Sequence, residues 1–257
     1  TEIRGRHHFA STDIYDQSIV SAWKSLQLPT PGHAVFLIAP PEQSPESSLS
    51  HMMGMIATQL ATHSTWIMSR ADSLDLEKML SVVDRDEPIA LFGTALSFLH
   101  LFDSIKKPIP FPSGSWAMET GGYKGTRHQL TKSELYQKFQ TKLKLDPDAI
   151  INEYSMTELS SQFYTSGLDR PHRGPGWTRV RVIDPVTNAE AKPGEPGHLI
   201  IYDLANLDSV MAIRTQDLAI RSETDLEQHP SSFSLIGRDP SALPRGCSRS
   251  SDEILSP

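Results

Sequence analysis

The chain has 257 residues, of which 38% are hydrophobic and 21% charged, a composition typical of a globular protein with a substantial core. Its formal net charge of −7 gives no general affinity for nucleic acid or for an anionic membrane surface. No apolar run is long enough to cross a bilayer and the first residues do not form a secretory signal, so we expect a cytoplasmic protein.

The first part of the chain alternates short apolar runs with helix-like stretches, the pattern of an α/β fold. The Ser-Ser-Leu-Ser segment at residues 47–50 is expected to cap the first helix of this series and Asp72 or Ser73 the second, because short polar side chains cap helices. The alternation implies right-handed crossovers in a mostly parallel sheet flanked by helices. Predicted strands cover residues 33–39, 64–69, 88–92 and 109–118, and predicted helices cover 47–60, 74–83, 95–102 and 131–145.

Beyond residue 164 the pattern changes to short apolar runs separated by Pro, Gly, Asn and Asp. Such spacing predicts a smaller β-rich subdomain attached to the α/β layer. We place the boundary near Gly174, with an α/β part over residues 1–173 and a β-rich part over residues 174–257. The predicted strands of the second part cover residues 180–183, 198–202, 210–214 and 233–236.

Cys247 is the only cysteine in the chain, so it cannot form an internal disulfide. Arg245 and Arg249 flank it, and Gly246 precedes it. Nearby cations favour the reactive thiolate, and glycine lets another group approach the backbone closely. Two interpretations therefore stand at this point: a nucleophile and an inert packing residue.

Four short segments follow one another in a particular order. A glycine-rich turn, Gly121-Gly122-Tyr123, comes directly after a predicted strand, at the sheet edge where open α/β folds bind ligands. It is followed by residues 152–158, 214–217 and 235–238. This order resembles the adenylate-forming superfamily, which activates carboxylic acids with ATP. Its members carry a glycine-rich turn beside adenine, a Tyr-Gly-x-Thr-Glu motif, a Thr-Gly-Asp motif and a Gly-Arg hinge motif.

The resemblance implies a role for each matching residue. Thr157 would donate its hydroxyl to the α-phosphate, and Glu158 would hold Mg²⁺, a hard cation that prefers oxygen ligands. Asp217 would accept from both ribose hydroxyls, and Arg238 would add a fixed positive charge near the ribose or phosphate. Taken alone, Glu158 could be a helix-start carboxylate, Asp217 a turn residue and Arg238 an exposed cation. The expected nucleotide-binding residues are Gly121, Gly122, Tyr123, Tyr154, Thr157, Asp217 and Arg238.

Six longer stretches carry a second resemblance: residues 4–8, 14–19, 119–125, 151–159, 201–207 and 245–248. Together they are similar to the acyl-protein synthetase family, whose best known member is the fatty-acid-activating component of the bacterial luminescence fatty acid reductase. The similarity implies that a long-chain fatty acid is activated as acyl adenylate, with ATP converted to AMP and pyrophosphate. It implies further that Cys247 receives the acyl group as a thioester and delivers it to a partner reductase, with Thr157 and Glu158 as the other catalytic residues.

The chain departs from the superfamily pattern in two ways. Ser155 and Gln216 stand where the motifs carry glycine, which asks for a backbone that accepts a side chain. The Ser/Thr/Gly-rich phosphate loop is not found, and Thr1 falls about where that loop should end. Since only ten residues follow Cys247, we also expect the large-domain fold without the mobile C-terminal domain.

These departures keep two alternatives open. One is a carboxylate ligase resembling phenylacetate or coenzyme F390 ligases, with a soluble acceptor. The other is a truncated module that binds nucleotide without catalysis. Two histidines, His7 and His8, could act near phosphate, but we expect an exposed surface pair. Acyl chain length and oligomeric state are not predicted.

Overall fold

The computed structural model describes residues 6–69, 73–121 and 130–240. The described residues form two compact units, and each draws on separate parts of the chain. The α/β unit consists of Pro29–Glu153 and Ser166–Leu168. The β-rich unit consists of the residues up to Leu28, Tyr154–Thr165 and the residues from Asp169 onward. The units are thus discontinuous, whereas the expected boundary near Gly174 is a single point, and the domains 1–173 and 174–257 stay a prediction.

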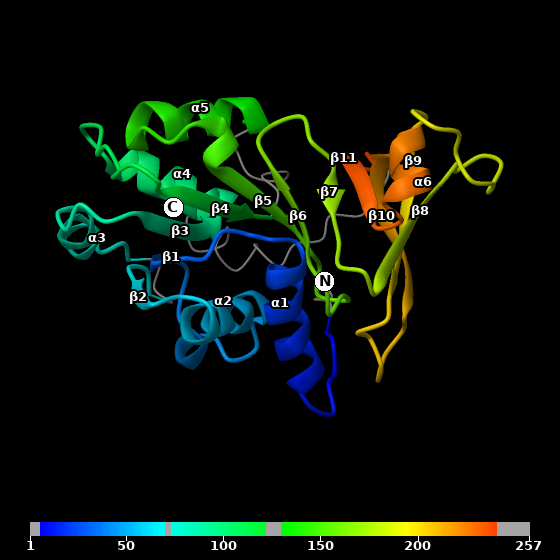
Figure 1. Cartoon of the computed structure of the whole chain (residues 1–257), viewed down its shortest axis with the longest axis horizontal. Coiled ribbons are helices and arrows are strands. Elements are labelled where there is room, and N and C mark those ends of the chain that lie inside the picture. Colours follow the sequence, from blue (N-terminus) through cyan, green and yellow to red (C-terminus); the bar gives the residue numbers. More distant parts are fainter. Residues whose placement is uncertain (1–5, 70–72, 122–129, 241–257) are drawn as a thin grey trace. The chain divides into compact units, whose positions relative to one another are not determined.

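The α/β unit is built on a parallel sheet in the order β2-β1-β3-β4-β5 (Figure 1). Its strands are short and, except for β2, almost entirely buried, as expected for a sheet covered on both faces. On neighbouring strands the rings of Trp66, Phe36 and Phe92 stack at centroid distances of 4.3 and 5.1 Å. The strands are β1 (His33–Leu37), β2 (His63–Trp66), β3 (Ile89–Thr94), β4 (Trp116–Thr120) and β5 (Ile150–Tyr154).

Four helices connect these strands, and α4 and α5 cover one face of the sheet while α2 lies on the other (Figure 1). Three begin at the polar side chains of Ser47, Thr94 and Thr131, each of which accepts a bond from a first-turn N–H group. Thr131 and Glu134 form a complete capping box. The helices are α2 (Ser48–Gln59), α3 (Leu76–Val83), α4 (Ala95–Ser104) and α5 (Lys132–Leu143), with single turns at Pro41–Gln43 and Pro147–Ala149.

The start of α3 differs from the expectation. Its cap is Asp75, whose side chain accepts from the Lys78 N–H at 2.9 Å, and not Asp72 or Ser73. Asp72 lies outside the described residues. Leu74 is not helical because it forms an isolated bridge with Met68. The helix therefore begins later than the apolar spacing indicated.

The predicted strand at 109–118 is also wrong in its first half, since β4 begins at Trp116. Pro110 and Pro112 have no N–H group to give a neighbouring strand. The N–H groups of Ile109 and Phe111 instead donate to the carbonyls of Lys142 and Leu143 at the end of α5, at 2.8 and 2.9 Å. This segment is thus tied to a helix end.

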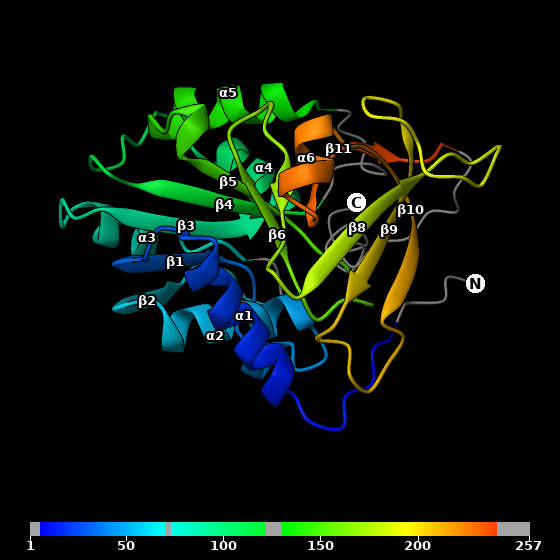
Figure 2. The ribbon, with the colours of Figure 1, turned by 45° about the vertical axis from the view of Figure 1, so that its right-hand side comes forward.

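The β-rich unit is an antiparallel sheet in the order β6-β7-β11-β10-β9-β8, and β8, β9 and β10 lie side by side in Figure 2. In β9 every second residue is buried, so one face of the strand packs on a core that includes Leu199, Ile201 and Phe233. The strands are β6 (Phe163–Ser166), β7 (His172–Arg173), β8 (Thr178–Ile183), β9 (Gly197–Asp203), β10 (Ala212–Ile220) and β11 (Ser232–Arg238). The unit also contains α1 (Asp13–Ser25) and α6 (Glu223–Gln228), which the sequence pattern did not predict.

A buried arginine joins several elements of this unit. The guanidinium of Arg221 donates to the carbonyls of Val180 in β8, Ser232 in β11, Asp225 in α6 and His229, at 2.7 to 3.1 Å. Burial lowers the pKa of Arg221, but carbonyls accept from four of its five N–H donors. Arg221 therefore acts as a polar clamp inside the sheet.

The observed α/β architecture with a mostly parallel sheet and a β-rich part confirms the fold class expected from the sequence. Within the described ranges, no helix has both the length and the apolarity needed to cross a membrane.

Candidate nucleotide-binding site

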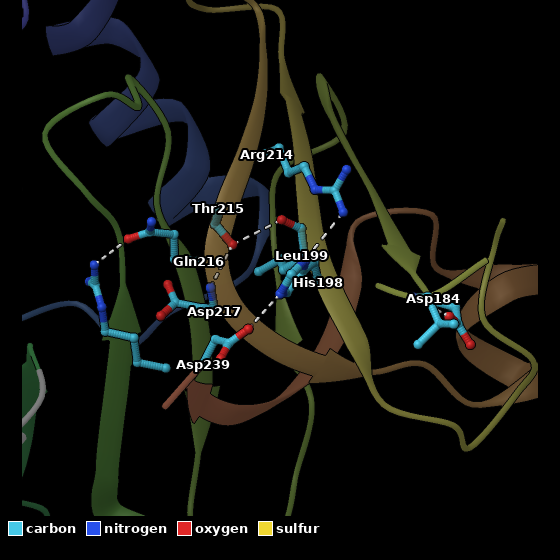
Figure 3. Close-up of polar contacts among 10 residues, drawn as sticks. Asp184, His198, Leu199, Arg214, Thr215, Gln216, Asp217 and Asp239 are labelled. Atoms are coloured by element: carbon cyan, nitrogen blue, oxygen red, sulfur yellow. Dashed lines mark hydrogen bonds and ion pairs between the residues drawn. The ribbon is translucent and has the colours of Figure 1, made fainter. Parts of the chain in front are cut away.

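Two of the motif segments meet at a hydrogen bond between side chains 63 residues apart. Tyr154, at the end of β5, is 8% exposed, and its hydroxyl donates to Asp217 Oδ2 at 2.8 Å. Burial and the neighbouring Asp217 carboxylate raise the pKa of Tyr154, so the phenol keeps its proton. Asp217 lies half-buried in β10, and its own N–H donates to Thr215 Oγ1 at 3.1 Å (Figure 3). Asp217 is therefore held both through its backbone N–H and through its side-chain carboxylate.

The Gly-Arg segment lies on the strand next to Asp217. Asp217 in β10 pairs with Arg238 in β11, and Arg238 Nη2 donates to Gln216 Oε1 at 2.6 Å. Gly237 has φ of 139°, a backbone conformation that side chains rarely adopt, which explains glycine at this position. Gln216 and Ser155 do not have positive φ. Both replacements of motif glycines are thus accommodated by ordinary backbone geometry.

A second polar chain continues from the residue after Arg238. His198 Nε2 lies 2.8 Å from Asp239 Oδ2, and Arg214 Nη2 lies 3.3 Å from His198 Nδ1 (Figure 3). Because an arginine can only donate, Nδ1 is the acceptor and Nε2 carries the proton given to Asp239. The N–H of Asp239 also donates to the Gln216 carbonyl at 2.8 Å. The chain that follows the Gly-Arg motif is thereby anchored to β9 and β10.

The loop after β5, which carries Thr157 and Glu158, is supported by the 201–207 segment. The buried Asp203 carboxylate accepts from the N–H groups of Ser160, Ser161 and Ala205 and from the Ser161 hydroxyl, at 2.7 to 3.0 Å. Four donors on one carboxylate explain why a charged group is tolerated at 0% exposure. Asp203 therefore supports the loop through its backbone N–H groups.

Asn206 completes this support. Its Nδ2 donates to the carbonyls of Glu158 and Val210 at 2.9 and 3.0 Å, and its Oδ1 accepts from the Ser160 N–H at 3.0 Å. From the sequence, residues 201–207 were singled out only by their similarity to a family. Their structural signal was an Asp and an Asn directly after an apolar strand, where side chains commonly bond to the backbone.

The His7 and His8 expectation is only half right. His8 is exposed, but His7 is half-buried, and its Nδ1 lies 3.1 Å from the Thr157 carbonyl. The His7 Nε2 lies 2.7 Å from the Ser209 hydroxyl. Nothing in the local sequence predicts this contact, because Thr157 lies 150 residues further along the chain.

In the α/β unit, the glycine-rich turn begins at the end of β4. Gly121 has φ of 77°, a left-handed conformation that suits glycine. Gly122 and Tyr123 lie outside the described residues. The two residues before Gly121 are buried and polar, and Thr120 donates its hydroxyl to the Glu153 carboxylate in β5. The turn therefore leaves the sheet next to a buried polar cluster.

The centre of that cluster is Glu119, which is fully buried. Its Oε1 accepts from Asn152 Nδ2 at 2.6 Å and from the Tyr136 hydroxyl at 3.3 Å. Burial is the main cause that raises the pKa of Glu119 to about 7, with a smaller rise from Glu153; Lys132 and the two hydrogen bonds oppose it. Glu119 thus titrates near neutral pH. Sequence reasoning missed this residue, although a carboxylate within an apolar strand was a visible signal.

The predicted site residues are thus distributed over the two units. Tyr154 and Asp217 contact each other, and Arg238 reaches the residue before Asp217. Thr157 and Glu158 lie on the supported loop of the same β-rich unit, whereas Gly121 belongs to the α/β unit. The remaining predicted residues, Gly122, Tyr123 and Cys247, lie outside the described ranges.

The sequence predicts Glu158 as the metal ligand. Among the described residues, no group of three His, Cys, Asp or Glu side chains could hold a metal ion. Glu158 is half-buried on its loop and would be a single carboxylate ligand. A single carboxylate suits Mg²⁺, which proteins commonly hold through one or two carboxylates together with phosphate oxygens and water.

One known protein family matches most of the chain. The family model described as "Acyl-protein synthetase, LuxE" matches residues 40–256. No curated protein matches the chain.

Solved structures show the same fold. ATP-bound MatB from Rhodopseudomonas palustris superimposes with a TM-score of 0.59 and 15% identity, over 87% of this chain and 42% of that one. O-succinylbenzoate coenzyme A synthetase (MenE) from Bacillus subtilis in complex with AMP gives a TM-score of 0.55 and 13% identity, over 88% and 45%. The same enzyme with ATP and a magnesium ion gives 0.56 and 13%, again over 88% and 45%. The chain therefore has the α/β fold of the adenylate-forming ligases and spans less than half of the length of these structures.

Proposed function

The chain belongs to the LuxE family of acyl-protein synthetases, and we propose that it activates a long-chain fatty acid with ATP and carries the acyl group on Cys247. The acyl group would then pass from this thioester to a partner reductase. The observation that carries the proposal is the Tyr154–Asp217 hydrogen bond, which joins the Tyr-x-x-Thr-Glu and Thr-x-Asp segments at one place. Two motifs that are 63 residues apart in sequence would serve one ligand.

Asp217 would bind the ribose. Tyr154 donates to Oδ2, which leaves Oδ1 and a second lone pair of Oδ2 to accept from the two ribose hydroxyls. Because the phenol keeps its proton, it orients the carboxylate and does not compete with it as an acceptor. Arg238, held by Gln216, would place its charge on the same side as the ribose or phosphate.

Thr157 and Glu158 would act at the phosphates. The Thr157 hydroxyl would donate to the α-phosphate, where the fatty carboxylate attacks and pyrophosphate leaves. Glu158 would hold Mg²⁺, which when bound offsets negative charge on the phosphate oxygens. Transition-state stabilisation depends on preorganised groups. The hydrogen bond that Asp203 accepts from the Ser160 N–H and the one that Asn206 donates to the Glu158 carbonyl hold the backbone of this loop.

Cys247 would perform the second half-reaction. Its thiolate attacks the carbonyl carbon of the acyl adenylate, so that a C–S bond forms, the C–O bond to phosphate breaks and AMP leaves. Arg245 and Arg249 favour the thiolate. A thiol on the same chain has a high effective concentration, so no second thiol substrate needs to bind.

Exchange of labelled pyrophosphate into ATP tests the first half-reaction. The proposal predicts exchange that requires a long-chain fatty acid and falls at least about tenfold in Asp217→Ala, since the ribose contact is lost. Formation of free acyl-CoA without labelled protein would favour a ligase with a soluble acceptor. Binding of AMP in calorimetry without any exchange would favour a noncatalytic nucleotide-binding module.

A further inference from the structure

One side chain of the N-terminal segment, His7, bridges two stretches of the β-rich unit. Its Nδ1 lies 3.1 Å from the Thr157 carbonyl, and its Nε2 lies 2.7 Å from the Ser209 hydroxyl. A carbonyl can only accept, so Nδ1 carries the proton and donates it to Thr157. The imidazole is held in place by stacking on Phe9 at a centroid distance of 4.0 Å, and Phe9 stacks in turn on Tyr15 at 5.7 Å.

The bond to Thr157 falls within a continuous series of contacts that fix the loop. His7 binds the carbonyl of Thr157, Asn206 binds the carbonyl of Glu158, and the N–H of Ser160 donates to both Asn206 and Asp203. Of these contacts, the bond from His7 is the one made to Thr157 itself. It also lies at the wall of a small hollow, together with Phe9, Ile14, Asn206, Leu207 and Ser209.

We infer that His7 is a positioning residue, which holds the Thr157 backbone so that the Thr157 hydroxyl and Glu158 carboxylate keep a fixed place at the nucleotide phosphates. The inference rests on the proposed function for its catalytic consequence, but its structural part does not. His7 acts through Thr157 and touches no reacting atom. The two imidazole nitrogens have separate partners, so their roles can be separated by substitution.

The matched variants are His7→Asn and His7→Gln. An asparagine places its amide nitrogen near the position of Nδ1, so it can still donate to the Thr157 carbonyl. A glutamine reaches the position of Nε2 and keeps only the Ser209 contact. Both variants remove the imidazole stacking on Phe9 equally, so they differ chiefly in the bond to Thr157.

Amide hydrogen exchange over residues 157–161 is the first readout. We expect exchange at Leu159, Ser160 and Ser161 to rise about tenfold in His7→Gln, as for one lost hydrogen bond, and to stay within about twofold of wild type in His7→Asn. Equal exchange in the two variants would overturn the inference, because His7 would then be a packing residue alone.

The second readout is fatty-acid-dependent pyrophosphate exchange. We expect a lower maximal rate in His7→Gln than in His7→Asn, with similar unfolding midpoints for the two proteins. Similar rates in both would also overturn the positioning role. If the wild-type protein shows no pyrophosphate exchange, the proposed function fails, whereas the amide exchange pattern still decides whether His7 holds Thr157.

Discussion

Replacing Glu119 by glutamine should remove a pH dependence from the stability of the α/β unit. Burial raises the pKa of this carboxyl to about 7, against an ordinary value of 4.5 in an unfolded chain, so the folded state binds the proton more tightly. Its stabilising contribution is therefore complete below about pH 4.5 and is lost as the pH rises through about 7. The gap corresponds to about 3 kcal/mol in the free energy of unfolding at most.

Urea denaturation at several pH values from about 5 to about 8 measures this contribution. In Glu119→Gln the Oε1 acceptor for Asn152 and Tyr136 is kept, but the titrating proton is gone. Over this range wild type should lose about 2 to 3 kcal/mol relative to the variant. Glu46→Gln, at an exposed loop position, is the matched control and should follow wild type. Parallel pH curves for wild type and Glu119→Gln would refute the reasoning.

Three further substitutions test separate contacts. Asp203→Ala leaves the buried N–H groups of Ser160 and Ser161 without this acceptor, so the free energy of unfolding in urea should fall by about 3 kcal/mol or more. A loss below about 1 kcal/mol would contradict the role of Asp203 in supporting the loop. Tyr154→Phe removes the donor that orients Asp217, so AMP affinity in calorimetry should fall about tenfold, and unchanged affinity would argue against a ribose site at Asp217. A lysine at position 221 cannot reach four carbonyls, so Arg221→Lys should lower the free energy of unfolding in urea by about 2 to 3 kcal/mol. Unchanged stability of this variant would show that the four hydrogen bonds are not needed.

Local signals in the sequence were enough to predict much of the fold. The strands at residues 33–39 and 88–92 and the helix start in the 47–50 segment depend on nearby apolar runs and on short polar side chains, which act over a few residues. The start of α3 was missed because Leu74 bridges to Met68, a contact outside the helix. The strand β10 continues to Ile220, beyond the predicted 210–214, because β9 and β11 provide partners on both sides.

For the candidate site, the sequence predicted residue identities but not their contacts. Sequence motifs were enough to predict Tyr154 and Asp217 as nucleotide-binding residues, yet the hydrogen bond between them depends on the fold of the β-rich unit. His7 was expected at the surface, since no pattern connects it with Thr157. The pKa of Glu119 could not be predicted either, because burial, the main cause of its rise, is a property of tertiary packing.

Covalent labelling of the protein tests the proposed function most directly. The protein is incubated with ATP, Mg²⁺ and a radiolabelled long-chain fatty acid, and the label that remains after denaturation is counted before and after treatment with neutral hydroxylamine. We predict a hydroxylamine-sensitive label on the wild-type protein that requires ATP and is absent from Cys247→Ser. Equal thioester labelling of Cys247→Ser, or no label on a wild-type protein that performs pyrophosphate exchange, would contradict an acyl-carrying role for Cys247.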